Sequence, residues 1–574
     1  MNNREVADTL ADIARMMELE GEDTYRIRAY RKAAGSVGSL RKDINECYRQ
    51  GRLRDIPGVG ESISQLITDL LETGRSEFYE TLKKEIPQEL FEVLAVPGIG
   101  RRTAVKVHKA LGVSSLREFE QAAAMHRIRK LEGLGERTER KILEAIEQFR
   151  QSERETRIPL FRALGVAAEA LEYLKDCGLE RAMVAGGIRR YAPMVSDVNI
   201  IGTAASPAEA VDCFTASPLA TAVKESSADE ARILTRYRVE STLELAESDN
   251  WGLRLAFATG SKKHLEELSE YAAGRGISLS REGFMNAVSL RYTKFRSESE
   301  LYAALGLEYI PPELREGRGE IEAAAAHALP DLVRMKDIRG DFHVHSDWSD
   351  GSGSIQEIAI AARALGYEYV AICDHSPSLA IAHGLSVERL RDQMDEIDRI
   401  NDTLEGFTVL KGSEVDIKPD GSLDLPDAVL EELDVVVASV HTGLRQEPDV
   451  ITARVMRALE SPYVTILGHP TGRILGGRRP ASVDMDGIIE AALANGKVLE
   501  LNAYPSRLDL GDENVRKAVD AGVMVSIDTD AHSLCELDFM DYGIHTAQRG
   551  WAPKNSVLNA LSYDGLLRFL GASA

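Results

Sequence analysis

Long apolar runs, paired cysteines and low-complexity tracts are all absent from this chain of 574 residues. A membrane-spanning helix needs about 20 consecutive apolar residues, so we expect no membrane span. The opening Met1-Asn-Asn-Arg-Glu-Val6 is unlike a secretory signal, which favours the cytoplasm. The cysteines are scattered, odd in number and never in a CxxC pair: Cys47, Cys177, Cys213, Cys373 and Cys535. We therefore expect a reducing compartment, with neither a disulfide framework nor a zinc ribbon.

Positive charge is also scarce, since 69 Lys+Arg stand against 92 Asp+Glu and give a net charge of −23. Taken over the whole chain, this balance argues against nucleic-acid binding. The deficit is local, however: residues 337–574 hold 20 basic and 39 acidic residues, a net −19, which leaves −4 for residues 1–336. Residues 101–150 reverse the sign, with 12 basic and 7 acidic residues. The first half of the chain can therefore still contain a nucleic-acid-binding part.

The apolar content of 44% and the charged content of 28% are those of a globular protein, and the length corresponds to roughly three to five domains. Residues 1–150 are expected to be helical, because apolar residues recur there at helical spacing. Residues 151–320 mix helices with short β-branched runs. From Gly340 onward, short apolar strands alternate with helices, which predicts a barrel-like parallel sheet.

Three short interruptions of the helical part share one pattern: Ile56-Pro-Gly-Val-Gly60, Val96-Pro-Gly-Ile-Gly100 and Leu131-Glu-Gly-Leu-Gly135. Glycine permits a tight turn, after which the free N–H groups of the next helix can hold a DNA phosphate without reading sequence. One such hairpin can be purely structural, but three in one stretch favour DNA binding. The expected DNA-binding residues are Gly58, Gly60, Gly98, Gly100, Gly133 and Gly135, with Arg101, Arg102 and Lys106 supplying positive charge.

Histidines and carboxylates gather in the second half at the ends of apolar strands. In Asp341-Phe-His-Val-His345, period-two alternation puts both imidazoles on one face of a strand, where they can bind one cation. The carboxyl ends of the strands of a βα barrel converge on one pocket. Six histidines and three carboxylates are then candidate ligands, enough for two or three first-row divalent ions: His343, His345, Asp350, His375, Glu414, His441, His469, Asp530 and His532.

Several segments together resemble the bacterial family X DNA polymerases: Gly21-Glu-Asp-Thr-Tyr-Arg-Ile-Arg-Ala-Tyr30, the three hairpins, Gly260-Ser-Lys-Lys-His264 and Tyr309–Glu320. The resemblance covers nearly the whole chain, in order. It implies a multidomain protein with a DNA-polymerase-beta-like core, made of all-α helix-hairpin-helix domains and an α+β nucleotidyltransferase palm and thumb. A distorted (β/α)7 barrel of the PHP (polymerase and histidinol phosphatase) type would follow this core.

The resemblance also implies domain boundaries. We expect an N-terminal helical DNA-binding domain at 1–90, a helix-hairpin-helix subdomain at 91–150, a palm at 151–245, a nucleotide-selecting subdomain at 246–318, a linker at 319–336 and the PHP phosphoesterase at 337–574. The core and the barrel would then each carry a site of their own.

The metal pattern of PHP domains is His-x-His, Asp, His, Glu, His, His and Asp-x-His. The nine candidate ligands fill every position of this pattern. By that likeness, Glu414 would bridge two metals. The metal is expected to be Mn²⁺, with Zn²⁺ and Fe²⁺ as alternatives, because imidazole and carboxylate together suit all three.

The palm of the family carries Gly-Ser-x-Arg-Arg, then Asp-x-Asp, then a third Asp. Here the motifs read Gly186-Gly-Ile-Arg-Arg190 and Asp197-Val-Asn199, and the third position falls at or near Thr242, flanked by Glu240 and Glu244. The resemblance implies catalytic roles for Asp197, Arg189 and Arg190, in a degenerate site with Asn199 and Thr242. Losing carboxylate charges from a two-metal site should lower the polymerase rate by several orders of magnitude. We expect Mg²⁺ or Mn²⁺ there only if the site is active.

These observations predict a DNA-repair protein whose PHP centre is a metal-dependent 3′→5′ exonuclease or phosphoesterase and whose polymerase site is impaired. Candidates for gripping substrate phosphates are Arg445, Arg478, Arg479 and Arg507. We expect gapped, nicked or 3′-ended DNA as partner, dNTP as a second ligand, and a monomer in the bacterial cytoplasm, associated with the nucleoid.

Two alternatives stay open. The first is an active gap-filling polymerase in which Glu240 or Glu244 replaces the lost carboxylate and Asn199 is tolerated. The second is a DNA-binding scaffold whose PHP site cleaves a small phosphate ester, with histidinol phosphate as the family precedent.

Overall fold

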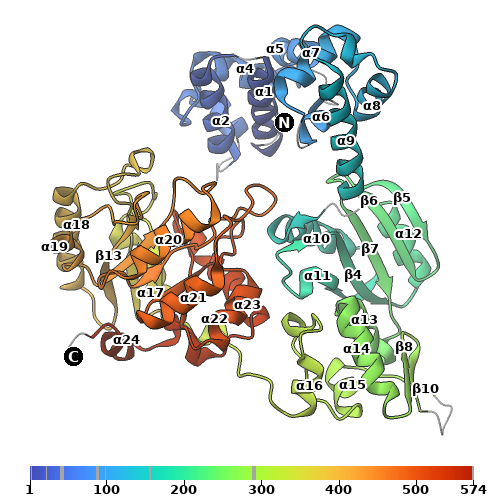
Figure 1. Ribbon diagram of the computed structural model, residues 1–574. Helices are drawn as coiled ribbons and strands as arrows, with labels where there is room; N and C mark the ends of the chain where they lie inside the picture. The colour runs from blue at the N-terminus through green and yellow to red at the C-terminus, as the bar shows by residue number, and fades with distance from the viewer. Residues whose placement is uncertain are drawn as a thin grey trace. The chain divides into compact units, whose positions relative to one another are not determined.

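The computed structural model describes residues 1, 3–20, 22–38, 44–85, 90–96, 99–153, 157–286 and 292–571. The chain divides into two compact units, residues 1–156 and 157–574, and each is described by itself. In Figure 1 the colours follow the chain, so the first unit runs from blue to teal and the second from green to red.

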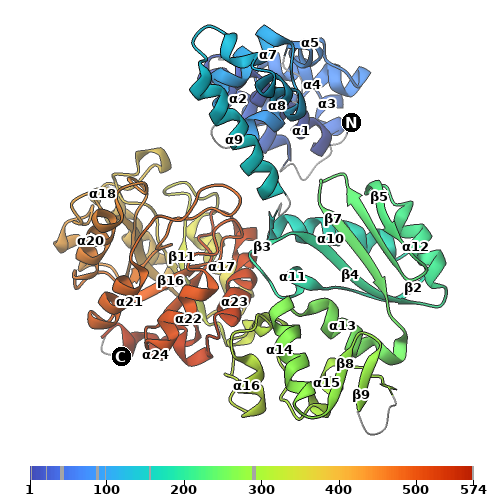
Figure 2. The same cartoon turned by 45° about the vertical axis from the view of Figure 1, so that its right-hand side comes forward.

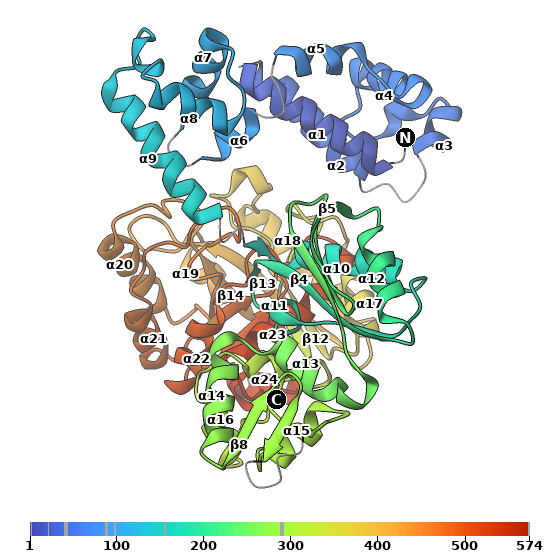
Figure 3. The ribbon, with the colours of Figure 1, turned by 90° about the vertical axis from the view of Figure 1, so that its right-hand side faces the viewer.

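The first unit is helical, as its apolar periodicity predicts. Its α-helices are α1 Asn3–Glu20, α2 Thr24–Gly38, α3 Ile44–Arg49, α4 Glu61–Thr73, α5 Glu77–Glu85, α6 Leu90–Ala95, α7 Arg101–Leu111, α8 Leu116–Ala124 and α9 Glu136–Glu153 (Figure 3). One apolar core joins them, in which Leu10 of α1, Ile67 of α4 and Phe119 of α8 are fully buried. Short 3-10 turns, η1 Leu53–Asp55 and η2 Ile128–Lys130, precede the first and third hairpins.

The first hairpin shows why glycine is needed between two of these helices. Gly58 has a φ of +84°, and a Cβ there would lie 2.9 Å from the backbone nitrogen of Ala33 in α2. Gly60 precedes α4 with a φ of −82° and has open space around it. A side chain at position 58 would be strained and would collide with α2, so glycine there lets the hairpin pack on that helix.

The second unit begins with an α+β segment built on a five-stranded sheet of order β2-β4-β7-β6-β5 (Figure 2). The strands are β2 Leu179–Val184, β4 Asp197–Ala204, β5 Ala220–Ser226, β6 Glu230–Thr235 and β7 Glu240–Leu245. Strands β4 and β7 pair in parallel, and the other neighbours are antiparallel. Helices α10 Leu160–Leu174 and α12 Pro207–Thr215 cover one face, where Val198 and Leu243 are buried. Alternate residues of β4 and β7 therefore face the other side of the sheet.

A disulfide joins Cys177, just after α10, to Cys213 on α12. The scattered cysteines argue against a disulfide framework, and this single bridge is not one, but nothing in their spacing indicated it. The two residues are 36 positions apart, and they meet because α10 and α12 pack on the same sheet face, with a Cα–Cα distance of 5.7 Å. The remaining cysteines, Cys47, Cys373 and Cys535, are free.

A helical segment with a small sheet follows. It contains α13 Trp251–Thr259, α14 Lys262–Ala273, α15 Glu298–Ala304 and α16 Glu320–Ala325, with antiparallel strands β8 Ile277–Ser280, β9 Gly283–Asn286 and β10 Tyr292–Thr293. The range 319–336 was expected to be a linker, but α16 lies within it. Ile321 and Ala324 of α16 are buried in the same apolar core as Leu253 and Leu301. The first part of this range is therefore packed structure, because α16 has an apolar face to bury.

The rest of the second unit is a nearly closed barrel of parallel strands in sequence order. These are β11 Gly340–Val344, β12 Tyr369–Ile372, β13 Thr408–Asp416, β14 Val435–Ser439, β15 Ile466–Leu467, β16 Val498–Asn502 and β17 Val525–Asp528. The helices of the barrel are α17 Ile355–Ala364, α18 Val387–Asn401, α19 Asp427–Leu430, α20 Pro448–Leu459, α21 Met485–Ala494, α22 Asp512–Asp520, α23 Met540–Arg549 and α24 Tyr563–Phe569. A bridge between Val344 and Ala531 links the first strand to the segment after the last. The predicted (β/α)7 barrel is thus confirmed.

Helix α23 of the barrel contacts the segment between β2 and β4, which contains the short helix α11 Gly186–Arg189 and the short strand β3 Met194–Val195. Tyr191 stacks on His545 with ring centroids 3.5 Å apart, and its hydroxyl donates to Asp541 at 3.2 Å. Arg549 donates to the backbone oxygen of Arg190 at 2.8 Å. One barrel helix therefore packs on the segment whose helix α11 carries the predicted Gly-Gly-Ile-Arg-Arg motif.

Candidate metal centre, palm site and DNA-binding hairpins

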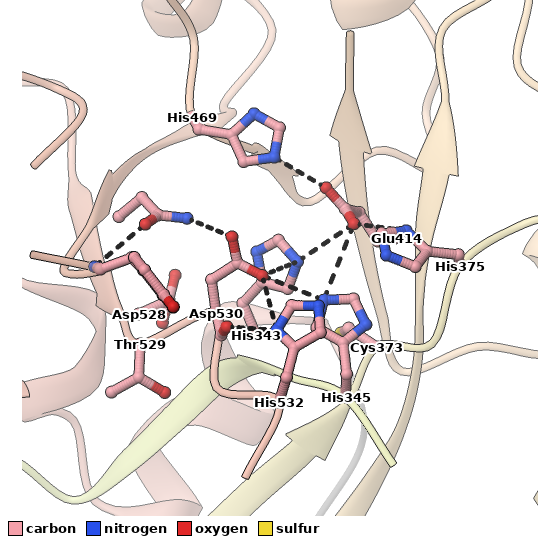
Figure 4. Close-up of polar contacts among 12 residues, drawn as sticks. His343, His345, Cys373, His375, Glu414, His469, Asp528, Thr529, Asp530 and His532 are labelled. Carbon is pink, nitrogen blue, oxygen red and sulfur yellow. Dashed lines mark hydrogen bonds and ion pairs between the residues drawn. The ribbon is translucent and has the colours of Figure 1, made fainter. Parts of the chain in front are cut away.

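The predicted metal ligands lie on barrel strands near their carboxyl ends or on the loops that follow. His343 is on β11 and Glu414 on β13. The others follow strands: His345 and Asp350 after β11, His375 after β12, His441 after β14, His469 after β15, and Asp530 and His532 after β17. Because these ends meet on one side of a parallel barrel, residues far apart in the sequence come together there (Figure 4).

The structure gathers these residues into three overlapping groups whose ligand atoms lie within 4.8 Å of one another. The groups are His345, Asp350, His375 and His532; His343, His345 and Asp530; and His375, Glu414 and His441. His469 joins the third group, because its Nε2 lies 2.9 Å from a Glu414 oxygen. Within the part of the chain that the structure describes, these are the groups of this kind. The nine residues predicted from the sequence therefore form one cluster.

Glu414 is the centre of the cluster. Its carboxylate is 1% exposed and faces five histidine nitrogens at 2.8–3.8 Å, those of His343, His345, His375, His441 and His469. Oε2 faces the first three histidines, and Oε1 faces the other two. The two oxygens thus address different sets of histidines, which suits a carboxylate that bridges two cations.

Several buried atoms of the cluster make no well-directed hydrogen bond: His343 Nε2, His345 Nδ1, His375 Nδ1, His469 Nδ1 and Glu414 Oε2. Some of them still lie at ion-pair distance, such as His375 Nδ1 and Glu414 Oε2 at 2.8 Å. Buried polar atoms nearly always make hydrogen bonds, so a set of close but poorly directed nitrogen and oxygen atoms suits bound cations. Imidazole and carboxylate are ligands for Mn²⁺, Zn²⁺ and Fe²⁺ alike. The residues present therefore fit first-row divalent ions without selecting one of them.

The pKa values of the residues in the cluster are shifted in different directions by burial and by neighbouring charges. Burial lowers the pKa of His345 to about 3, against the effect of its hydrogen bond with Asp530. Burial also opposes protonation of His375 and His441, but neighbouring carboxylates raise their pKa values to about 10 and about 9. Although burial alone would raise it, the surrounding histidines hold the pKa of Glu414 well below its usual range. The carboxylate stays charged and attracts cations, and metal binding would displace protons from the two basic histidines.

Two carboxylates that the sequence analysis did not single out contact these histidines. Glu500 on β16 is fully buried and accepts a hydrogen bond from His343 Nδ1 at 2.6 Å. Asp416 on β13 accepts one from His441 Nδ1 at 3.0 Å. The available signals were a single acid inside the apolar run Val498-Leu-Glu-Leu-Asn502 and a second acid two residues after Glu414.

Two of the candidate phosphate-gripping arginines lie close to the cluster or to each other. Arg507 Nε is 3.5 Å from an Asp530 oxygen. Burial lowers the pKa of Arg478, and the nearby charge of Arg507 lowers it further, so the two guanidinium groups interact. Arg507 therefore places positive charge beside Asp530 of the metal centre.

The palm residues predicted for nucleotidyl transfer lie together. Asp197, Asn199 and Thr242 line a cavity of about 240 Å³, which Glu240 and Glu244 also line. Asn199 and Thr242 are direct neighbours in the parallel register of β4 and β7. Among the described residues, however, every close group of ligand atoms belongs to the barrel and none to this cavity. Glu244 is paired with Arg254 at 2.7 Å, so a metal ion would compete with this arginine for the carboxylate.

The arginines of the first palm motif are already paired. Arg189 donates from both terminal nitrogens to Glu298, at 2.6 and 2.8 Å. Arg190 donates to Glu316 at 2.9 Å. Both side chains are mostly buried, at 15% and 13% exposure. A triphosphate would therefore compete with these two glutamates for the arginines.

The hairpin residues are described in part. Gly98 lies outside the described residues, as do the side chains of Arg101 and Arg102, whose backbone begins α7. Lys106 of α7 donates from Nζ to the backbone oxygen of Glu132 in the third hairpin. The third hairpin turns at Gly133, with a φ of +73°, and Gly135 leads into α9, as Gly100 leads into α7. The second and third hairpins are thus in contact through Lys106.

A basic pocket of about 730 Å³ lies between α2 and the first hairpin. Its lining includes Gly58 and Gly60 together with four basic side chains, those of Arg26, Arg28, Lys32 and Arg54. The sequence analysis did not single these four out, although Tyr25-Arg-Ile-Arg-Ala-Tyr-Arg-Lys32 is visibly basic. Positive side chains beside a helix N-terminus are suited to binding phosphate.

Comparison with protein-family models shows which class of protein the chain belongs to. Family models match four segments in order: a helix-hairpin-helix domain over 1–76, a SAM-like helix-hairpin-helix tandem over 90–148, a DNA polymerase beta thumb over 254–316 and a PHP domain over 341–504. This is the order of a family X DNA polymerase with a C-terminal PHP domain. No helix among the described residues is both long and apolar enough to cross a bilayer.

Sequence identity to known proteins identifies the family of this chain. The chain is 36% identical over 574 residues to the DNA polymerase/3′-5′ exonuclease PolX of Bacillus subtilis (strain 168), covering 99% of each chain. Shorter matches include a probable phosphatase of Thermoanaerobacter sp. (strain X514), 29% identical over 38% of this chain and 89% of the relative. Another is a probable phosphatase of Acetivibrio thermocellus, 32% identical over 35% of this chain and 82% of the relative. The chain belongs to the PolX family of bacterial family X DNA polymerases with a PHP domain.

Proposed function

We propose that this protein is a DNA-repair enzyme that shortens DNA from the 3′ end at its barrel metal centre, as a metal-dependent 3′→5′ exonuclease or phosphoesterase. The observation that carries the proposal is the cluster around Glu414, where nine ligand residues gather and five buried atoms make no well-directed hydrogen bond. The names of the relatives, a 3′-5′ exonuclease and probable phosphatases, both denote hydrolysis of phosphate esters.

The nine residues would hold two or three divalent ions, Mn²⁺ first, with Zn²⁺ or Fe²⁺ as alternatives. When bound, such ions supply a nucleophilic water near neutral pH and polarise the oxygens of a phosphate ester. The chain's own part is to place the ligands. Glu414 separates two sets of histidines, and Arg507, 3.5 Å from Asp530, brings a positive charge to the rim where a substrate phosphate would lie.

The helical first unit would hold gapped, nicked or 3′-ended DNA by its phosphates, without reading sequence. Its helix-hairpin-helix matches and the basic pocket beside Gly58 support this role. We propose that the protein acts as a monomer in the cytoplasm, on the DNA of the nucleoid.

The nucleotidyl-transfer site is impaired in this proposal. Asn199 stands where the family carries a carboxylate, the third carboxylate position falls at or near Thr242, and Arg189 is paired with Glu298. Two-metal catalysis depends on those charges, so little dNTP incorporation would remain.

The exonuclease proposal is tested on a 5′-labelled single strand with Mn²⁺. The purified full chain should shorten the strand from its 3′ end, and His343→Ala should reduce the rate by about 100-fold or more, because a metal ligand is lost. His327→Asn is the matched control: this exposed histidine lies outside the cluster, at a φ of +51° that asparagine tolerates. If DNA stays intact while p-nitrophenyl phosphate or histidinol phosphate is hydrolysed, the scaffold-phosphatase alternative replaces this proposal.

A further inference from the structure

Two carboxylates outside the ligand set contact metal-facing histidines on the ring nitrogen that points away from Glu414. His343 Nδ1 lies 2.6 Å from Glu500, while its Nε2 lies 3.5 Å from Glu414. His441 Nδ1 lies 3.0 Å from Asp416, while its Nε2 lies 3.2 Å from Glu414. The two histidines are thus held in the same way, each between an outer carboxylate and the central one.

The outer contact decides which nitrogen is free to bind a cation. An ionised carboxylate only accepts hydrogen bonds, so it keeps the proton of a neutral imidazole on Nδ1. The lone pair is then left on Nε2, the nitrogen that faces Glu414. A histidine without such a partner can exchange tautomers and turn its ring.

Glu500 has a second contact that ties two ligand positions together. Its other oxygen accepts the backbone N–H of His469 at 2.5 Å. His469 has a φ of +25°, a conformation that side chains rarely adopt and that surrounding contacts must hold in place. Asp416 is anchored similarly, because its second oxygen accepts the hydroxyl of Ser378 at 3.0 Å.

We propose that Glu500 and Asp416 are positioning residues of the metal centre, which fix His343 and His441 in the tautomer and orientation that present Nε2 to a divalent cation. The inference rests on the metal centre of the proposed function and goes beyond its ligand set. Outer carboxylates of this kind typically contribute 10- to 100-fold in metal affinity.

Glutamine at position 500 cannot reproduce both contacts. His343 Nδ1–H and the His469 N–H are both donors, whereas a carboxamide has one acceptor oxygen and one donor NH₂ group. Whichever way the amide is turned, its NH₂ group faces a donor or forces His343 to carry its proton on Nε2. Either result weakens the presentation of a ligand.

The test measures Mn²⁺ binding to the metal-free full chain by calorimetry and by the Mn²⁺ paramagnetic resonance signal. Glu500→Gln should weaken binding by about 10- to 100-fold. The matched control is Glu320→Gln, since Glu320 is also fully buried and accepts from a histidine, His264 Nδ1 at 2.7 Å, and from the Gly317 amide at 2.7 Å. Glu320→Gln removes the same charge from the same kind of pair in another core, so Mn²⁺ affinity should not change.

Asp416→Asn provides a second arm if Glu500→Gln does not fold, because His441 is the more exposed of the two histidines, at 15% against 0%. The same 10- to 100-fold loss is expected. Wild-type affinity in a folded Glu500→Gln or Asp416→Asn would overturn the positioning role while the metal centre stands. If the wild-type chain itself binds no Mn²⁺, the metal centre of the proposed function fails, and this inference fails with it.

Discussion

At the scale of single residues, the two sites of this protein differ in what their charged groups contact. In the barrel, buried ligand atoms such as His343 Nε2 and Glu414 Oε2 make no well-directed hydrogen bond. In the palm, Arg189 is bound to Glu298. Gly187 stands where the family carries a serine. A Cβ at this position would lie 2.8 Å from the Val195 side chain, which would have to shift to make room for a serine. The barrel thus pairs its carboxylates with histidines, whose protons a divalent cation would displace, whereas the palm pairs its arginines with carboxylates.

Glu298 allows a pH-dependent test of that internal pairing. Burial would raise its pKa, but Arg315 and Arg189 lower it from 4.5 to about 2. Because the folded value is the lower one, the pairing contributes fully above pH 4.5 and is lost as the pH falls toward 2. The contribution is about 3 kcal/mol near neutral pH, of which about 1 kcal/mol is lost by pH ~3.5.

The measurement is denaturant unfolding of the second unit in wild type and Glu298→Gln. The variant should be less stable near neutral pH by about 3 kcal/mol, because it leaves Arg315 buried without its partner charge. The difference from wild type should narrow as the pH is lowered from about 6 to about 3.5. A difference that stays constant over this range would show that the carboxylate charge is not what stabilises the pair.

At the scale of helices and strands, the way in which neighbouring elements pack determines where the candidate binding sites form. The first hairpin packs on α2 only because Gly58 has no side chain, and the basic pocket forms between those two elements. In the barrel, the parallel strands end on one side, so short strands far apart in sequence each contribute one or two ligands. In the hairpin and in the barrel alike, local sequence motifs supply the residues. The packing of helices and strands then brings those residues together as a pocket or a metal centre.

Two neighbouring glycines of the first hairpin should therefore respond differently to alanine. Gly58→Ala should cost the first unit about 1–3 kcal/mol, because the residue has a φ of +84° and its Cβ would meet the Ala33 nitrogen at 2.9 Å. Gly60→Ala should cost less than about 1 kcal/mol, since its φ is ordinary and the space is open. Thermal unfolding of the full chain checks the stabilities, and fluorescence anisotropy with a gapped duplex should show weaker binding by Gly58→Ala. Equal losses in the two variants would contradict the packing argument.

At the scale of the whole molecule, the charge of −23 describes neither half of the chain. Most of it, −19, lies on residues 337–574, where the carboxylates of the metal centre are also found. Divalent cations bound at the barrel metal centre would offset part of this negative charge where a DNA end would bind. The basic pocket and the basic stretch at 101–150 lie in the other half. Binding to DNA should therefore be weak and sensitive to salt.

A primer annealed in gapped DNA should distinguish the activities of the two halves. With dNTP and Mn²⁺ or Mg²⁺, we expect the primer to become shorter rather than longer, because the barrel cluster is intact and the palm lacks carboxylates at Asn199 and Thr242. Gel analysis of the labelled primer is the readout, and His343→Ala removes degradation so that slow extension can be seen. Robust extension that Asp197→Ala abolishes would show that the palm is active and support the gap-filling alternative.

Local patterns in the sequence indicated the helical first part, the barrel-like sheet and the ligands of the barrel centre. These patterns are the helical periodicity in residues 1–150, the strand–helix alternation after Gly340, and the His-x-His spacing of His343 and His345, which places both rings on one strand face. The palm and thumb were expected from the family resemblance alone. The expected linker at 319–336 begins with helix α16, whose packing into an apolar core depends on residues far away in the sequence.

Only the tertiary structure decided which groups are paired. Glu500 meets His343 across 157 positions, Arg189 meets Glu298 across 109, and Cys177 meets Cys213 across 36. Nothing in the local sequence around Arg189 distinguishes a free arginine from one bound to a carboxylate. Hydrogen bonds and ion pairs depend on distances of a few ångströms between side chains, and the packing of remote segments sets those distances.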